Sequence, residues 1–208
     1  MGCRIYLIRH GETLWNHALK YQGHTDIGLS DRGIRQAKAL AKRLSSERFA
    51  AFYASDLRRA IDTARIVAGP HNGRVLPVPA LREINFGEWE GLTRDEIKAR
   101  FPDVSRQWWD TPYTTRLPGG ETLEEVSTRA VQALEGIALS HPDEQVVVVS
   151  HGGTIRAAIA TFLYMDLNQY WRLKQDNAAL NILEVLEKGR AMLLLFNDCV
   201  HLKGADEC

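Results

Sequence analysis

The chain has 208 residues, enough for one compact domain with a sizeable core. Its 26 Lys and Arg residues balance its 26 Asp and Glu residues. This balance argues against a nucleic-acid-binding protein, which would use an excess of positive charge to displace counterions. No run of about 20 apolar residues is present, so we expect no membrane-spanning segment.

The N-terminus and the cysteines indicate a cytoplasmic protein. Residues 1–9 predict a strand that runs straight into a motif, which leaves no room for a signal peptide. Cys3, Cys199 and Cys208 have neither the spacing of metal ligands nor that of a disulfide framework. We therefore expect reduced and unreactive thiols.

Strand-like and helix-like segments alternate through the first 80 residues. A β-branched and aromatic run at 5–8 predicts a buried strand. Ser30 is placed to cap a helix whose apolar residues recur at helical spacing, namely Ile34, Ala37, Leu40, Ala41 and Leu44. Residues 52–54 predict a short strand, and a second helix follows with an apolar face formed by Leu57, Ala60, Ile61, Ala64 and Val67. Residues 75–78 predict a strand that its prolines confine to an edge or an end.

Residues 81–120 differ from their surroundings. Aromatic, charged, Pro and Gly residues break the periodicity of this stretch. We interpret it as an excursion from the sheet rather than a part of the sheet core.

The second half returns to alternating elements. Thr122 and Glu125 form a capping box that predicts the start of a long helix. The valine run at 146–149 predicts a strand buried on both faces, with a helix after it. Runs at 180–186 and 192–196 flank a Lys-Gly turn and predict a hairpin. The alternation predicts one domain over residues 1–208, a three-layer α/β/α fold with a mostly parallel sheet.

Two histidines follow predicted strands at their carboxyl ends, where parallel sheets gather ligands. His10 follows the first strand and His151 follows the valine strand; each precedes a glycine that lets backbone N–H groups approach an anion. Arg9 precedes His10, and Arg58 and Arg59 fall in the first turn after the strand that ends near residue 55. Two imidazoles and at least two guanidiniums at one sheet edge suit a phosphate dianion.

The same cluster can carry out chemistry. A neutral imidazole is a competent nucleophile toward phosphorus, and the reaction then needs an acid to protonate the departing alkoxide. Glu83 follows a strand end most closely and is the first candidate for this acid. Glu12, Glu88 and Glu90 are the alternatives.

An ordered set of motifs resembles the histidine phosphatase superfamily, which includes the cofactor-dependent phosphoglycerate mutases. The set begins with Leu-Ile-Arg-His-Gly-Glu-Thr at 7–13 and ends with Ser-His-Gly-Gly at 150–153. Between them stand Trp-Asn at 15–16, Gln-Gly at 22–23, Leu-Ser at 29–30 with Gly33, Ser-Asp-Leu-Arg-Arg-Ala at 55–60, Leu-Arg-Glu at 81–83, Phe-Gly-Glu-Trp-Glu-Gly at 86–91 and Gly-Gly-Glu at 119–121. The matches keep chain order and cover the sequence up to about residue 159.

The resemblance implies a role for each core residue. His10 would accept the phosphoryl group and Glu83 would protonate the leaving group. Arg9, Arg59 and His151 would form the phosphate pocket, with Arg59 preferred to Arg58 because it directly precedes the alanine of its motif. Four further positions would bind phosphate or substrate: Asn16, Gln22, Gly23 and Gly152.

The sequence predicts neither a metal nor another cofactor. His10, Glu12 and His151 are conceivable metal ligands by residue type, but Arg9 and Arg59 would repel a divalent cation. The other histidines have no Zn-like spacing; His24 is the nearest to the site in sequence and the one that could touch substrate. Core packing explains most of the aromatic residues, and Trp108, Trp109 and Tyr113 are the alternative candidates for walls of the pocket.

The short excursion, expected to lie over the active site, resembles that of the phosphatase branch. This branch includes α-ribazole phosphatases, metal-independent phosphoserine phosphatases and broad-specificity phosphatases. We therefore expect a metal-independent enzyme that hydrolyses a small-molecule phosphomonoester, with a weak preference for an apolar or aromatic leaving group. The oligomeric state is left open, and a homodimer is compatible with the sequence.

Three alternatives remain. A phosphoglycerate mutase would benefit from surplus cations, but acids match those of the excursion and no Arg-Arg pair occurs there. A protein phosphohistidine phosphatase would need a more open site than the excursion allows. A catalytically silent phosphate-binding module would be expected to have lost His10, Arg59 or His151, and all three are present.

Overall fold

A six-stranded sheet in the order β3-β2-β4-β1-β5-β6 forms the centre of the protein. It is seen in a computed structural model that describes residues 2–186 and 190–203. The strands are β1 (Gly2–Arg9), β2 (Ala51–Ala54), β3 (Val75–Pro77), β4 (Gln145–Ser150), β5 (Leu180–Leu186) and β6 (Ala191–Asp198). β3, β2, β4 and β1 pair in parallel, whereas β5 is antiparallel to β1 and to β6. The prediction of a mostly parallel sheet is confirmed.

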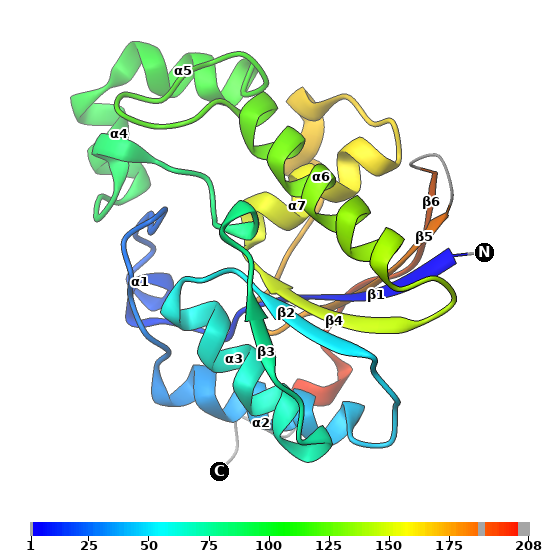
Figure 1. Ribbon diagram of the computed structural model, residues 1–208. Helices are drawn as coiled ribbons and strands as arrows, with labels where there is room; N and C mark the ends of the chain where they lie inside the picture. The colour runs from blue at the N-terminus through cyan, green and yellow to red at the C-terminus, as the bar shows by residue number, and fades with distance from the viewer. Residues whose placement is uncertain (1, 187–189, 204–208) are drawn as a thin grey trace.

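Helices cover both faces of the sheet, as the alternating elements predicted (Figure 1). α2 (Asp31–Leu44) and α3 (Arg58–Ala68) lie on one face, and α6 (Leu123–Ser140) and α7 (Gly152–Phe162) lie on the other. Val146 and Val148 of β4 pack with α6 and α7, and Val147 and Val149 pack with α2 and α3. All four valines are fully buried, because a central strand turns alternate side chains into two different cores.

Local capping signals begin the long helices where the sequence predicted. The Ser30 side chain accepts a hydrogen bond from the Gly33 N–H at the start of α2. The Thr122 hydroxyl accepts one from the Glu125 N–H, and the Glu125 carboxylate accepts one from the Thr122 N–H. Each bond satisfies a backbone donor that the first helical turn leaves unpaired.

The excursion contains helices that the sequence analysis missed. α4 (Arg94–Arg100) begins with a Thr93–Glu96 capping box, and α5 (Pro102–Asp110) has its proline in the first turn. These helices pack on a third core with α6 and α7, which includes Trp89 and Trp108. Short helices occur elsewhere, namely α1 (Leu14–His17) and 3-10 turns at Gly69–His71, Pro79–Leu81, Gly87–Trp89, Leu167–Arg172 and Val200–Leu202.

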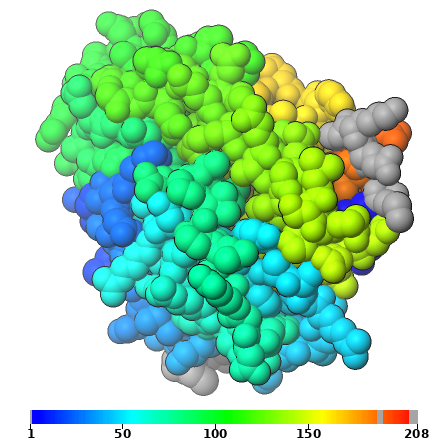
Figure 2. Space-filling model, in the orientation of Figure 1, coloured from blue at the N-terminus to red at the C-terminus, as the bar shows by residue number. Residues whose placement is uncertain are grey.

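The excursion meets the loop that follows β1. The Tyr21 N–H donates to the Leu92 carbonyl at 3.0 Å, and the Gly91 N–H donates to the Tyr21 carbonyl at 2.8 Å. In the space-filling view, the blue residues of this loop and the green residues of the excursion form one continuous surface (Figure 2). The two segments therefore build one structure over the carboxyl end of β1.

The expectations for the hairpin, the cysteines, the membrane-spanning segment and the single domain have different outcomes. β5 and β6 form the predicted antiparallel pair, but the Lys188-Gly189 turn lies outside the described residues. Cys3 and Cys199 are free thiols, and Cys208 also lies outside the described residues. Over residues 2–186 and 190–203, every helix is too short or too polar to cross a membrane. The single domain stays a prediction.

Two leucines on α6 test the packing of the helix layer. Leu134 is 1% exposed and Leu139 is 81% exposed. Leu134→Ala removes buried methyl groups, so it should lower the free energy of unfolding by about 2–5 kcal/mol. Leu139→Ala should change it by less than about 0.5 kcal/mol. Chemical denaturation measures both, and equal losses would contradict the observed orientation of α6.

Candidate active site

The two histidines lie side by side because they follow neighbouring parallel strands. β1 ends at Arg9 and β4 ends at Ser150, which pair with each other in the sheet. The ring centres of His10 and His151 are 5.1 Å apart, and their planes are inclined by 58°. Both side chains are buried. The argument from strand ends therefore predicted this pair correctly.

The hydrogen bonds of His10 leave one ring nitrogen free to attack. Nδ1 lies 2.7 Å from the Gly11 carbonyl oxygen. Since a carbonyl oxygen can only accept, Nδ1 carries the hydrogen of the neutral ring and Nε2 keeps its lone pair. Neutral His10 can therefore act as a nucleophile through Nε2.

His151 has the opposite tautomer. Arg59 Nε donates to His151 Nδ1 at 3.2 Å, so a neutral His151 ring carries its hydrogen on Nε2. This buried Nε2 has no hydrogen-bond partner among the described residues. A buried donor without a partner is costly, and an oxygen atom of a bound ligand would satisfy it.

The fully buried guanidinium of Arg59 and the partly buried one of Arg9 complete the cluster. Arg59 is 0% exposed and donates to the carbonyl oxygens of Gly23 at 2.7 Å and Thr25 at 2.8 Å. Arg9 Nη1 donates to the Gln175 carbonyl. Burial lowers the pKa of Arg9 to about 10, so the group still carries its charge at neutral pH.

Burial also keeps both histidines neutral. It is the main cause that lowers the pKa of His10 well below its ordinary value, and the charges of Arg59 and Arg9 act in the same direction. Burial and the charge of Arg59 lower the pKa of His151 in the same way. Neutral imidazoles beside fixed guanidiniums form a site for an anion.

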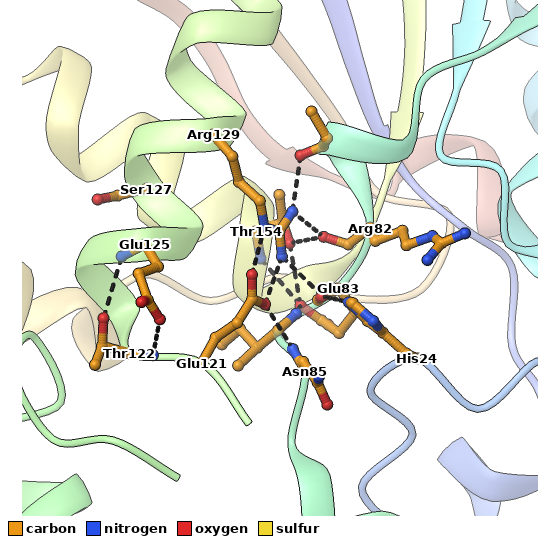
Figure 3. A network of polar contacts seen from close by, with 12 residues as sticks. His24, Arg82, Glu83, Asn85, Glu121, Thr122, Glu125, Ser127, Arg129 and Thr154 are labelled. Carbon is orange, nitrogen blue, oxygen red and sulfur yellow. Dashed lines mark hydrogen bonds and ion pairs between the residues drawn. The ribbon is translucent and has the colours of Figure 1, made fainter. Parts of the chain in front are cut away.

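Glu83 lies beside the N-terminus of α7 and faces this cluster. Its Oε2 accepts a hydrogen bond from the Gly153 N–H, and its Oε1 accepts one from the Thr154 N–H, each at 3.1 Å. The close view shows Glu83 beside Thr154 (Figure 3). Glu83 lines a hollow of about 210 Å³ together with His10, Arg9 and Arg59. The hollow therefore combines a neutral imidazole, guanidinium groups and one carboxyl group.

Comparison with known proteins agrees with this geometry. A family model described as "Histidine phosphatase superfamily (branch 1)" matches residues 5–198. The chain belongs to the histidine phosphatase superfamily. The resemblance of the sequence motifs is thereby confirmed.

Some similar members of the superfamily are named phosphatases, and others are named probable phosphoglycerate mutases. Phosphoserine phosphatase 1 of Hydrogenobacter thermophilus is 36% identical over 199 residues, which cover 96% of this chain and 94% of that protein. A phosphoserine phosphatase variant of Entamoeba histolytica in complex with phosphoserine superposes with a TM-score of 0.88 at 30% identity, covering 96% and 99% of the two chains. For the α-ribazole phosphatase of Shigella flexneri, the TM-score is 0.82 at 27% identity, with 94% and 96% covered. These relatives support a phosphomonoesterase of the superfamily.

The other candidate acids lie elsewhere. Glu12 accepts from Ser30 Oγ and pairs with Arg32, and Glu88 is exposed. Glu90 accepts hydrogen bonds from the N–H groups of residues 24 and 25 at 2.8 and 2.9 Å. None of the three lines the hollow around His10.

The four further predicted residues are placed in different ways. Asn16 and Gln22 line the hollow. Their side-chain oxygens accept hydrogen bonds from Thr13, so their side-chain NH2 groups remain as donors. Gly23 is outside the lining and acts on it through its carbonyl bond to Arg59. Gly152 lines an adjacent hollow of about 410 Å³, which shares Arg9 and Glu83 with the first.

His24, Arg58 and the predicted pocket walls lie outside the lining. His24 Nε2 donates to the Glu83 carbonyl oxygen at 2.9 Å, and Arg58 is exposed and pairs with Asp62. None of the three candidate aromatic walls lines the hollow. Trp108 is fully buried in the third core, in agreement with core packing, Trp109 stacks on Trp171, and the Tyr113 hydroxyl donates to Glu124.

Sequence reasoning missed much of the lining. The missed residues are Leu19, Lys20, Tyr21, Phe86, Arg156, Tyr170 and Trp171. Arg156 had a detectable signal, because it is the charged residue in the otherwise apolar run that follows the Ser-His-Gly-Gly motif. Tyr170 and Trp171 had none, since their 3-10 segment reaches the hollow only through the fold.

The low pKa values predict how the free enzyme titrates. In nuclear magnetic resonance spectra, the ring signals of His10 and His151 should not shift as the pH falls through about 6.5, where a histidine of an unfolded chain takes up its proton. Substitution of each histidine by alanine assigns its signal, and the chain unfolded in urea is the control. A midpoint at or above 6.5 for either ring in the folded protein would contradict the neutral site.

Proposed function

We propose that this phosphomonoesterase hydrolyses a small phosphorylated metabolite through a phosphohistidine on His10. Phosphoserine and α-ribazole 5'-phosphate are the first candidate substrates. The observation that carries the proposal is a complementary pair of ring nitrogens: His10 Nε2 offers a lone pair, and the N–H of His151 Nε2 has no hydrogen-bond partner among the described residues. One can attack phosphorus while the other binds an oxygen of the same group.

In the first step, His10 Nε2 attacks phosphorus, and the N–P bond forms as the P–O bond to the leaving group breaks. Arg9, Arg59 and the His151 N–H stabilise the charge on the phosphoryl oxygens. Protonated Glu83 gives its proton to the departing oxygen, so the leaving group departs as an alcohol.

In the second step, water attacks the phosphohistidine. The Glu83 carboxylate takes a proton from the water, the P–N bond breaks, and His10 regains its lone pair. Inorganic phosphate leaves and Glu83 is again protonated. Atoms and charges therefore balance over the cycle, and the chain's own residues carry every step.

The rest of the lining suggests the substrate class. Tyr21 and Trp171 are partly exposed aromatic residues of the lining, and their rings suit the base of α-ribazole. The Arg156 guanidinium lies 4.8 Å from the centre of the Tyr170 ring and pairs with no carboxylate of the described residues. It suits a second anionic group, such as the carboxylate of phosphoserine.

The proposed setting is the cytoplasm, with a small-molecule phosphomonoester as the partner. Cys3 and Cys199 are free, which suits a reducing compartment. We make no proposal about a homodimer.

Steady-state phosphate release tests the proposal. The panel contains an aryl phosphate, phosphoserine, α-ribazole 5'-phosphate and 3-phosphoglycerate, with EDTA present. Wild type should release phosphate, and His10→Ala should lower kcat by at least about a thousandfold, because it removes the nucleophile. His17→Ala, at an exposed position beside the same loop, is the matched control and should retain wild-type rates.

Other outcomes would contradict the proposal. Release that persists in His10→Ala would exclude the covalent route. Isomerisation of 3-phosphoglycerate with no phosphate released from any ester would identify a mutase instead.

A further inference from the structure

The segment that carries Glu83 is held by side chains. Residues 80–85 span the end of the Pro79–Leu81 3-10 turn and the start of the excursion, outside the sheet and the α-helices. The Leu81 carbonyl accepts from Ser150 Oγ at 2.8 Å, and the Arg82 carbonyl accepts from Thr154 Oγ1 at 2.7 Å. Because no ladder fixes this backbone, the position of Glu83 depends on the groups that bind its carbonyls.

Arg129 of α6 supplies three further bonds of this kind (Figure 3). Its Nη1 donates to the carbonyl oxygens of Ala80 at 2.7 Å and Arg82 at 2.8 Å, and its Nη2 donates to that of Glu83 at 2.9 Å. Nε and Nη2 donate to the two carboxylate oxygens of Glu121 at 2.8 and 2.9 Å. The five bonds use all five N–H donors of a guanidinium.

Glu121 fixes Arg129 and also binds the segment directly. Its Oε2 accepts from the Asn85 N–H at 2.8 Å, and its own N–H donates to the Asn85 carbonyl at 3.0 Å. Burial alone would raise the pKa of Glu121, but the bonds and charge of Arg129 outweigh it and lower the pKa. Glu121 therefore stays ionised, and the pair is a two-point clamp that orients the guanidinium.

We propose that Arg129, fixed by Glu121, is the positioning residue for the proton donor Glu83. This inference rests on the proposed function, in which Glu83 protonates the leaving group. His24 contacts the same Glu83 carbonyl from the side opposite Arg129 (Figure 3). Without Arg129, the carbonyls of Ala80 and Arg82 lose donors and the carboxyl group of Glu83 shifts relative to the departing oxygen. A displacement of about 1 Å is enough to cost up to about a hundredfold in rate.

Dependence on the leaving group separates positioning from a general structural role. A poor leaving group needs the proton of Glu83, whereas an activated phenolate departs without it. The readout is kcat/KM, which includes the step that breaks the P–O bond, over aryl phosphates of increasing phenol pKa and one alkyl phosphate. The Glu83→Gln variant shows how strongly kcat/KM depends on the leaving-group pKa when the acid is absent.

Arg129→Met should show the same selective loss on poor leaving groups as Glu83→Gln. We expect kcat/KM to fall about 10- to 100-fold on the alkyl phosphate, and less than about threefold on the most activated aryl phosphate. The double variant with Glu83→Gln should be no slower on the alkyl phosphate than Glu83→Gln alone, because both changes remove one function.

Two further variants complete the design. Arg129→Lys keeps the positive charge but cannot make the five bonds, so a selective loss in it reports geometry rather than charge; it also serves if Arg129→Met does not fold. Arg116→Met is the matched control, because Arg116 pairs with Glu125 at 2.6 Å and binds the Gly120 carbonyl rather than residues 80–85. It should leave the leaving-group dependence unchanged.

The possible contrary results separate a failure of this inference from a failure of the proposed function. Equal slowing of all substrates by Arg129→Met and Arg129→Lys, with Glu83→Gln still selective, would overturn this inference alone. A nonselective Glu83→Gln would overturn the acid role and this inference, while phosphate release by wild type would still support the phosphatase. No release by wild type from any ester would overturn the proposed function as well.

Discussion

Arg59 is fully buried, and the atoms that accept its hydrogen bonds are neutral. They are one imidazole nitrogen of His151 and the carbonyl oxygens of Gly23 and Thr25. No carboxylate of the described residues forms an ion pair with this guanidinium, and such a buried charge is costly to maintain. A phosphate dianion would supply the missing negative charge. Burial is the main cause of the lowered pKa of both neighbouring histidines, and the charge of Arg59 is the second cause. The charge of the site therefore depends on this buried cation, which also adds to the effect of burial on the two histidines.

The excursion fixes the loop that binds the Arg59 guanidinium. Glu90, in the Phe-Gly-Glu-Trp-Glu-Gly motif, accepts hydrogen bonds from the backbone N–H groups of His24 and Thr25. The loop that it fixes presents the two carbonyls that bind Arg59. Gly23 has a positive φ of 53°, and a Cβ atom there would overlap the Glu90 carboxylate. A motif far from β1 in the sequence thus shapes the phosphate pocket.

Local patterns predicted what short-range physics determines. Strand ends placed His10 and His151 together, and capping signals marked the starts of α2 and α6. The same logic failed for α4 and α5, because aromatic and charged residues obscure the periodicity of two short helices. Hydrophobicity alone also could not separate the buried Trp108 from Trp171, which lines the hollow. The bonds of Arg129 to carbonyls nearly 50 residues earlier leave no trace in a local pattern.

The central claim is that His10 attacks phosphorus through Nε2. Rapid quenching of the enzyme during turnover of an aryl phosphate, at alkaline pH to preserve a phosphoramidate, would trap the intermediate. Peptide mapping then locates the phosphoryl group, and phosphorus resonance distinguishes the two ring nitrogens. The account predicts phosphate on His10 at Nε2, because Nδ1 is held by the Gly11 carbonyl. Phosphate on Nδ1, on His151 or on any other residue would contradict it.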